Sequence, residues 1–157
     1  MGRNEPWSEE RTRAIVAEHS GREGPLLPIL HAVQHAFGHV PSAAVPVIAE
    51  ALNLSRAEVH GVVTFYHDFR QEPAGRHVLK ICRAEACQSM GAEALVAHAE
   101  ERLGIACGHT TADGAVTLEP VYCLGLCATA PSVMIDGRVA GRLDEAKLDA
   151  VLKGATA

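Results

Sequence analysis

The sequence lacks long apolar runs and an excess of basic residues. Its apolar stretches are interrupted by Pro, His or Glu well before the roughly 18 residues that a membrane-spanning helix needs. Against 19 Asp and Glu there are only 14 Lys and Arg, which gives a net charge of −5. Proteins that bind nucleic acid usually carry a basic surface. We therefore expect neither a membrane protein nor a nucleic-acid-binding protein.

Nucleotide-binding motifs and a signal segment are also missing. No Gly-x-Gly-x-x-Gly follows a predicted strand, and no Gly-x4-Gly-Lys-Ser/Thr occurs. Such loops place main-chain N–H groups against phosphates, so any NAD in the reaction is expected on another subunit. The first ten residues contain no apolar segment of the signal-peptide kind, from which we expect a cytoplasmic protein.

The first 75 residues show the periodicity and capping signals of helices. Apolar residues recur at helical spacing before Gly38, which is placed to end a helix. Further on, Ser55 and Glu58 form a capping box. The predicted helices run from Ser8 to Ser20, from Pro25 to Phe37, from Ser42 to about Leu52, and onward from Ser55. Four helices with short connections predict a small helical bundle over residues 1–75.

The pattern changes after the Glu-Pro-Ala-Gly turn at residues 72–75. Strands are predicted at residues 77–81, 115–121, 133–135 and 139–140, and helices at 89–103 and after Asp144. Strand, helix, strand indicates a parallel pair with a right-handed crossover, and Asp136-Gly137 indicates a hairpin. The predicted fold class is α+β: the helical bundle, then a thioredoxin-like α/β domain over residues 76–157 with a four-stranded mixed sheet.

Four of the five cysteines form two closely spaced pairs. Cys82-x4-Cys87 follows the first predicted strand, and Cys123-x3-Cys127 follows the second. If these strands are parallel neighbours, both pairs lie beyond the same edge of the sheet. In a reducing compartment, an odd number of cysteines indicates metal ligands or free thiols rather than disulfides.

Several kinds of thiol chemistry compete for these pairs. A dithiol oxidoreductase uses Cys-x-x-Cys, which neither pair has. Structural zinc sites usually have tighter Cys-x2-Cys knuckles, whereas a [2Fe-2S] cluster takes four thiolates around two irons and tolerates wider loops. Unliganded cysteines leave the two matched pairs unexplained. The spacing favours the iron–sulfur cluster and leaves a zinc-stabilised interaction module as an alternative of another class.

The neighbours of the pairs suit an anionic cluster. N–H donors and the positive end of a helix stabilise negative charge, and the predicted helix near Ser89 directs its N-terminus towards Cys87. We expect Gly125, having no side chain, to let the backbone approach sulfur. A positive charge could come from Arg83, although a solvated arginine is the simpler interpretation.

The two cysteine pairs, together with the upstream Glu-Val-His-Gly-Val-Val-Thr-Phe-Tyr at residues 58–66, resemble a known family. It is the thioredoxin-like [2Fe-2S] subunit family of NADH dehydrogenase modules. It includes the small iron–sulfur subunit of respiratory complex I and its counterparts in soluble hydrogenases and NAD-dependent formate dehydrogenases. The resemblance implies one [2Fe-2S] cluster per chain, held by Cys82, Cys87, Cys123 and Cys127. The remaining Cys107 has no place in the pattern.

Residues 66–70 (Tyr-His-Asp-Phe-Arg) and 82–91 (Cys-Arg-Ala-Glu-Ala-Cys-Gln-Ser-Met-Gly) look most like the gamma subunit of cytoplasmic, molybdenum-containing formate dehydrogenases. This implies a non-catalytic electron-transfer subunit that exchanges electrons with the FMN of an NAD-binding flavoprotein subunit. A molybdenum-containing catalytic subunit would oxidise formate. The alternatives within the family are the equivalent subunit of complex I or of an NAD-reducing hydrogenase.

Overall fold

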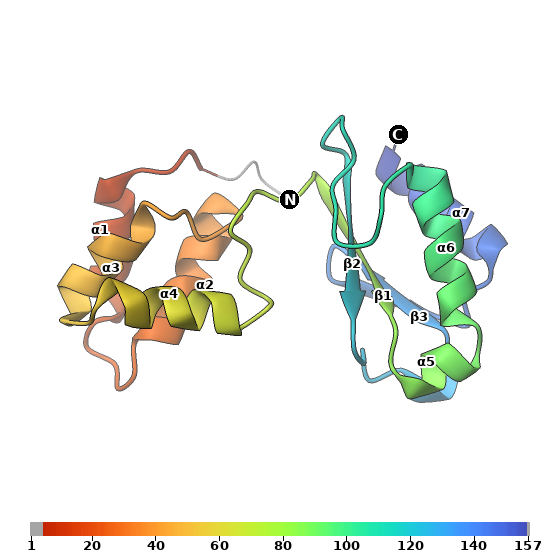
Figure 1. The fold of residues 1–157 in the computed structure, drawn as a ribbon, viewed down its shortest axis with the longest axis horizontal. Helices are drawn as coiled ribbons and strands as arrows, with labels where there is room; N and C mark the ends of the chain where they lie inside the picture. Colours follow the sequence, from red (N-terminus) through yellow and green to blue (C-terminus); the bar gives the residue numbers. More distant parts are fainter. Residues whose placement is uncertain (1–4, 157) are drawn as a thin grey trace. The chain divides into compact units, whose positions relative to one another are not determined.

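The computed structural model describes residues 5–156. The N-terminal stretch in which we expected no signal segment therefore lies partly outside the described residues. The chain divides into two compact units, Met1–Pro73 and Ala74–Ala157 (Figure 1). One unit is helical and the other contains a four-stranded sheet, and each has a hydrophobic core of its own. The predicted α+β fold class is confirmed.

Four helices make up the described part of the first unit. They are α1 (Glu9–His19), α2 (Leu26–Phe37), α3 (Ala44–Leu52) and α4 (Arg56–Phe65). The Ser8 side chain caps α1 by accepting from the Arg11 N–H at 3.1 Å, and Gly38 ends α2 with a φ of 78°. The capping box of Ser55 and Glu58 opens α4. These start and stop signals act as the sequence predicts.

The start of α3 differs from the prediction. We expected Ser42 to open this helix, but α3 begins at Ala44 and has no side-chain cap. The chain instead enters the helix through a main-chain turn, in which the Ala44 N–H donates to the Pro41 carbonyl at 2.9 Å. Since this turn already pairs the first free N–H groups, a serine cap is not needed there.

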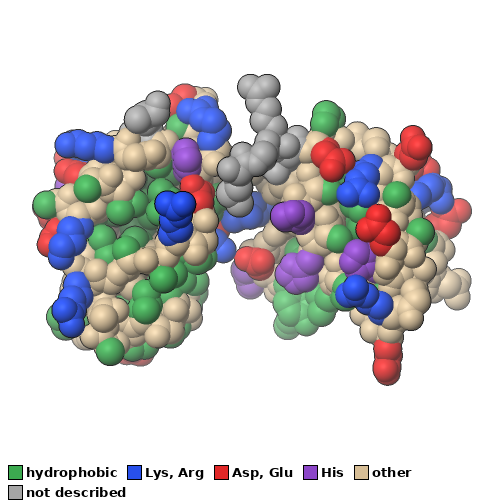
Figure 2. Space-filling model, turned by 180° about the vertical axis from the view of Figure 1, so that it is seen from behind, with side chains coloured by type: hydrophobic (Ala, Val, Ile, Leu, Met, Phe, Trp, Pro, Cys, Tyr) green, Lys and Arg blue, Asp and Glu red, His purple; other side chains and the backbone are tan. Residues whose placement is uncertain are grey.

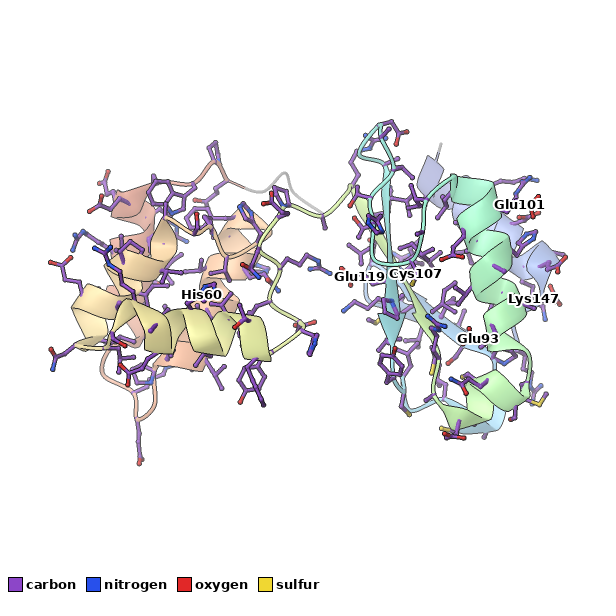
Figure 3. The ribbon with its side chains drawn as sticks, viewed as in Figure 1. His60, Glu93, Glu101, Cys107, Glu119 and Lys147 are labelled. Atoms are coloured by element: carbon purple, nitrogen blue, oxygen red, sulfur yellow. The ribbon has the colours of Figure 1, made fainter. Side chains whose placement is uncertain are left out.

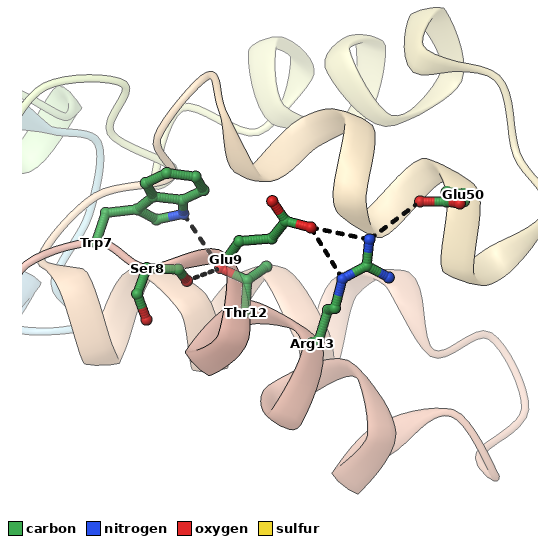
Figure 4. Close-up of polar contacts among 6 residues, drawn as sticks. All are labelled: Trp7, Ser8, Glu9, Thr12, Arg13 and Glu50. Atoms are coloured by element: carbon green, nitrogen blue, oxygen red, sulfur yellow. Dashed lines mark hydrogen bonds and ion pairs between the residues drawn. The ribbon is translucent and has the colours of Figure 1, made fainter.

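Buried aliphatic side chains from all four helices form the core of this unit, with Ile29, Leu30 and Val33 fully buried. Burying each such side chain contributes about 1.5–3 kcal/mol. Polar contacts add to the packing of α1 (Figure 4): Arg13 bonds to Glu9 at 2.9 Å and reaches Glu50 of α3 at 3.3 Å. These groups are exposed, so the core, and not this ion pair, dominates the stability.

The second unit is built on a mixed sheet with the order β2-β1-β3-β4. Its strands are β1 (His77–Cys82), β2 (Val116–Val121), β3 (Ser132–Ile135) and β4 (Arg138–Gly141), and its α-helices are α5 (Glu85–Ser89), α6 (Ala92–Leu103) and α7 (Glu145–Thr156). The predicted parallel pair is β1 with β2, and the other pairings are antiparallel. Figure 1 shows α6 and α7 on the same side of the sheet, where their apolar faces form the core with the strands.

One predicted helix is in fact two. We expected a single helix from Ser89 to Leu103, but Gly91 has a φ of 91° and separates α5 from α6. That left-handed backbone is accessible to glycine without steric cost. As a result Cys87 lies inside α5, and the helix that follows it starts later than expected, at Ala92, which packs in one buried cluster with Cys82 and Cys87.

In the described residues, no helix is both long and apolar enough to span a membrane. Figure 2 shows that the face drawn carries both basic and acidic side chains on each unit. Neither unit presents charge of one sign alone on that face.

Candidate metal centre

Four of the cysteines lie together beyond the C-terminal ends of β1 and β2. We call this place, with Cys82, Cys87, Cys123 and Cys127, the thiol edge. Cys82 ends β1 and is paired in register with Val121, the last residue of β2. Because Cys123 follows Val121 by two residues, the parallel ends bring the two pairs of cysteines together. Cys87 lies in α5, and Cys127 opens a short 3-10 turn, Cys127–Thr129. The sequence predicts this juxtaposition, and all five cysteines are free thiols.

The four sulfurs interact with one another. Cys123 Sγ and Cys127 Sγ are 3.7 Å apart, and two thiolates on one tetrahedral metal ion, with bonds of about 2.3 Å, are separated by about 3.8 Å. The Cys82 thiol is hydrogen-bonded to Cys87, and the Cys87 charge acts in turn on Cys127. Within residues 5–156, no group of three His, Cys, Asp or Glu side chains is arranged to hold a single metal ion. Two pairs of thiols fit the two irons of a [2Fe-2S] cluster.

The two pairs differ in exposure and in ionisation. Cys82 and Cys87 are buried, whereas Cys123 and Cys127 are exposed. Burial opposes ionisation of Cys82, but hydrogen bonds from Cys87 and from main-chain N–H groups hold the pKa of this thiol below its ordinary value. These N–H groups belong to Ala84, Cys123 and Leu124. At the exposed pair, a hydrogen bond with the Cys123 side chain and the negative charge of Cys123 raise the pKa of Cys127. The surroundings of Cys82 thus favour the thiolate that a metal requires.

Gly125 brings a main-chain N–H to within 3.3 Å of Cys123 Sγ, the approach that we expected. The reason for glycine is different, because a side chain built at this position meets no atom within 4 Å. Gly125 has a φ of 77°, which other residues adopt only with strain. Its backbone conformation, and not its small size, is therefore what the loop requires.

Arg83 is paired and not simply solvated. Its guanidinium donates to both oxygens of Glu93, in the first turn of α6, at 2.9 and 2.6 Å, and these bonds hold the pKa of Glu93 below its usual range. The Arg83 carbonyl also accepts from Gln88 Nε2 at 2.9 Å. Arg83 therefore connects the segment between Cys82 and Cys87 to α6 through its side chain and to Gln88 of α5 through its carbonyl.

Cys107 lies outside the thiol edge, as its absence from the pattern suggests. It lies between α6 and β2 beside Glu119 (Figure 3), and its N–H donates to Glu100 at 2.8 Å. Partial burial is the main cause that raises the pKa of this thiol. Its surroundings disfavour the thiolate.

Two residues near the thiols were not predicted. Ser132 Oγ lies 3.5 Å from Cys87 Sγ, and Gly141 packs so closely on Thr129 that a side chain would come within 2.5 Å of Thr129 Oγ1. The only sequence signal for Ser132 is a lone hydroxyl at the head of an apolar strand. Both contacts join residues that are distant in the sequence, so local patterns do not reveal them.

A thioredoxin-like sheet with four free thiols beyond the ends of two parallel strands is the arrangement that we expect of a ferredoxin-type electron carrier. The chain belongs to the thioredoxin-like [2Fe-2S] ferredoxin family, which matches residues 12–156. The family that the cysteine pairs and residues 58–66 resemble is confirmed, and with it the [2Fe-2S] cofactor.

Subunits of two named oxidoreductase complexes are similar in sequence to most of this chain. A subunit of the NADH-quinone oxidoreductase of Rhizobium meliloti (strain 1021) is 40% identical over 144 residues, which cover 92% of this chain and 86% of the relative. The HndA subunit of the NADP-reducing hydrogenase of Solidesulfovibrio fructosivorans is 34% identical over 83% of this chain and 77% of its own length. The crystal structure of an NAD+-reducing [NiFe]-hydrogenase in the air-oxidised state contains a similar fold, with a TM-score of 0.72 and 29% identity over 83% of this chain. The match covers only 22% of that hydrogenase chain.

Proposed function

We propose that Cys82, Cys87, Cys123 and Cys127 hold the [2Fe-2S] cluster, and that this chain is the small electron-transfer subunit of a nicotinamide-linked oxidoreductase complex. The observation that carries the proposal is the set of four interacting free thiols where β1 and β2 end. When bound, such a cluster supplies reversible electron transfer at a potential set by its ligands and surroundings.

The residues around the thiols have complementary roles in this proposal. Cys82 and Cys87 hold the buried side, where main-chain N–H donors stabilise negative charge on sulfur. The exposed Cys123 and Cys127 leave the other side accessible to a redox partner. Because the sequence has no nucleotide-binding motif, we place FMN and NAD on a flavoprotein subunit that docks there. The names of the two relatives, from an NADH-quinone oxidoreductase and an NADP-reducing hydrogenase, support a nicotinamide-linked assembly.

The parent complex that we propose is a cytoplasmic formate dehydrogenase. Its support is the similarity of residues 66–70 and 82–91 to the gamma subunit of molybdenum-containing enzymes. In this assembly, electrons from formate, oxidised at molybdenum in another subunit, reach NAD through iron–sulfur centres and flavin. The relatives named above favour a second candidate, the equivalent subunit of complex I or of an NAD-reducing hydrogenase.

Native affinity purification of the tagged full chain from its source organism tests the assembly. We expect an FMN-containing, NAD-binding subunit and a molybdenum-containing subunit to co-purify, and the chain by itself to oxidise neither NADH nor formate. Quinone-reducing membrane subunits would assign the chain to complex I, and nickel–iron subunits to a hydrogenase. Recovery of the chain alone would contradict the proposed partnership.

A further inference from the structure

Ser132 places a buried hydroxyl group against one of the proposed ligands. Its Oγ lies 3.5 Å from Cys87 Sγ, and both residues are at most 2% exposed. Ser132 opens β3 and Cys87 lies in α5, 45 positions earlier in the sequence. The hydrogen bond therefore connects the sheet to the helix that carries the ligand.

A buried hydroxyl at this position needs an explanation. Without a partner it would cost about 1–3 kcal/mol, whereas alanine would occupy nearly the same volume without that cost. The rest of β3 is Val-Met-Ile. The interaction with Cys87 accounts for the hydroxyl, and the chemistry of sulfur fixes its direction. Between two neutral groups either atom can donate, but a thiolate has no proton, so the serine must donate to a ligating sulfur.

We infer that Ser132 is a positioning residue that raises the reduction potential of the cluster by donating a hydrogen bond to Cys87 Sγ. This inference rests on the proposed function, in which Cys87 is a ligand. Reduction adds negative charge to the cluster and its sulfurs, so a donated hydrogen bond stabilises the reduced state more than the oxidised state.

Ser132 also differs in kind from the donors at the other thiols. The N–H groups that reach Cys82 and Cys123 belong to the main chain, so side-chain replacement does not remove them. The Ser132 hydroxyl is removed by a single substitution, and its contribution to the potential is therefore measurable by itself.

The test compares the full chain with its Ser132→Ala variant, both purified anaerobically. Iron and acid-labile sulfide are quantified first, and the midpoint potential is then measured by redox titration. We expect unchanged cluster content and about a tenfold shift of the redox equilibrium towards the oxidised form, which is about 59 mV to lower potential for one electron. Thr117→Val is the matched control, because it removes a buried hydroxyl that bonds to Thr110 and to the Gly75 N–H instead of to sulfur. Its midpoint should equal that of the wild type.

The outcomes separate this inference from the proposed function. A wild-type chain without iron and sulfide would overturn the proposed function. An intact cluster in Ser132→Ala with an unchanged midpoint would overturn the inference alone. If Ser132→Ala does not retain the cluster, Ser132→Gly removes the same hydroxyl and its midpoint decides. Loss of the cluster in both variants would show that Ser132 maintains the site without tuning it, and would also overturn the inference.

Discussion

The helical unit and the sheet unit use unusual backbone conformations for different purposes. Among the described residues of the helical unit, Asn53 is the one non-glycine residue with positive φ, and it caps the end of α3. The sheet unit, over residues 74–156, has three: Cys123 at the thiol edge, Asp136 in the β3–β4 turn, and Arg142 just after β4. Such conformations cost of order 1–3 kcal/mol each and persist only when the surroundings impose them. Because Cys123 is the one of these three that we propose as a cluster ligand, we expect the stability of the sheet unit, and not that of the helical unit, to depend on the bound cluster.

The two thiol loops of the sheet unit also differ from each other. The loop with Cys82 and Cys87 is fixed locally, by α5 and by the Arg83–Glu93 pair. The turn that Cys127 opens is fixed from a distance: the Arg142 N–H donates to the Thr129 carbonyl at 2.6 Å. Substitutions far from any cysteine in the sequence are thus expected to displace the turn that Cys127 opens.

The largest effect is expected from removing a ligand. Replacing any one of Cys82, Cys87, Cys123 or Cys127 with Ser should reduce iron and sulfide to a small fraction of the wild-type content, because serine is a poor substitute for a thiolate ligand. The matched control is Cys107→Ser, which should retain the full cluster. Elemental analysis with visible absorption measures both, and a cluster that survives in one of the four variants would remove that cysteine from the site.

A core substitution in the helical unit tests whether the stability of that unit is independent of the cluster. Leu30→Ala should cost about 2–5 kcal/mol of unfolding free energy, because it leaves a cavity in a fully buried position. Iron content and the visible spectrum of the sheet unit should not change. Denaturant unfolding followed by circular dichroism, in parallel with visible absorption, measures both. Loss of the cluster in this variant would mean that the two units are not independent in stability.

Gly141→Ala should weaken the Cys127 turn from outside the site. The added carbon would lie 2.5 Å from Thr129 Oγ1 and 2.6 Å from the Thr129 carbonyl oxygen, so the turn has to move. Overpacking of this kind costs about 1–3 kcal/mol, and we expect the cluster to be lost severalfold faster in the presence of an iron chelator. Gly154→Ala is the control, since a side chain there meets nothing within 4 Å. Equal rates of loss for the two variants would contradict the assigned role of Gly141.

The smallest effect is expected at Asp136, which connects the hairpin to β1. Burial opposes its ionisation, but His77 at 2.6 Å and the Val78 N–H at 3.0 Å hold the pKa of Asp136 below its usual value. A lowered pKa stabilises the fold above the unfolded-state value of about 3.9, and this contribution is lost as pH falls through the lower folded value. Asp136→Asn should cost about 1 kcal/mol at pH 7. The difference should disappear on acidification, and a difference in unfolding free energy that is independent of pH would contradict this cause.

The parts of the fold that follow from local signals were predictable. The Ser55–Glu58 capping box, the glycine after α2 and the Asp136-Gly137 turn each specify a backbone geometry within a few residues. The same holds for the cysteine edge, because parallel neighbouring strands end on one side of the sheet. Spacing alone could not predict the break at Gly91, since glycine is also tolerated within helices.

The supporting contacts of the site could not be predicted for a different reason. Ser132 with Cys87, and Gly141 with Thr129, meet only after the sheet has formed and β4 has returned beside β3. Nothing in the sequence near either residue indicates its partner. The sequence predicts the cysteines themselves, and the structure adds the contacts that Ser132 and Gly141 make around them.

The metal and sulfide content of the anaerobically purified full chain decides whether the thiol edge holds an iron–sulfur cluster. We predict two irons and two acid-labile sulfides per chain, as a [2Fe-2S] cluster requires, together with visible absorption that is lost in the four cysteine variants. Stoichiometric zinc without sulfide would contradict this prediction and would identify the thiol edge as a structural zinc site.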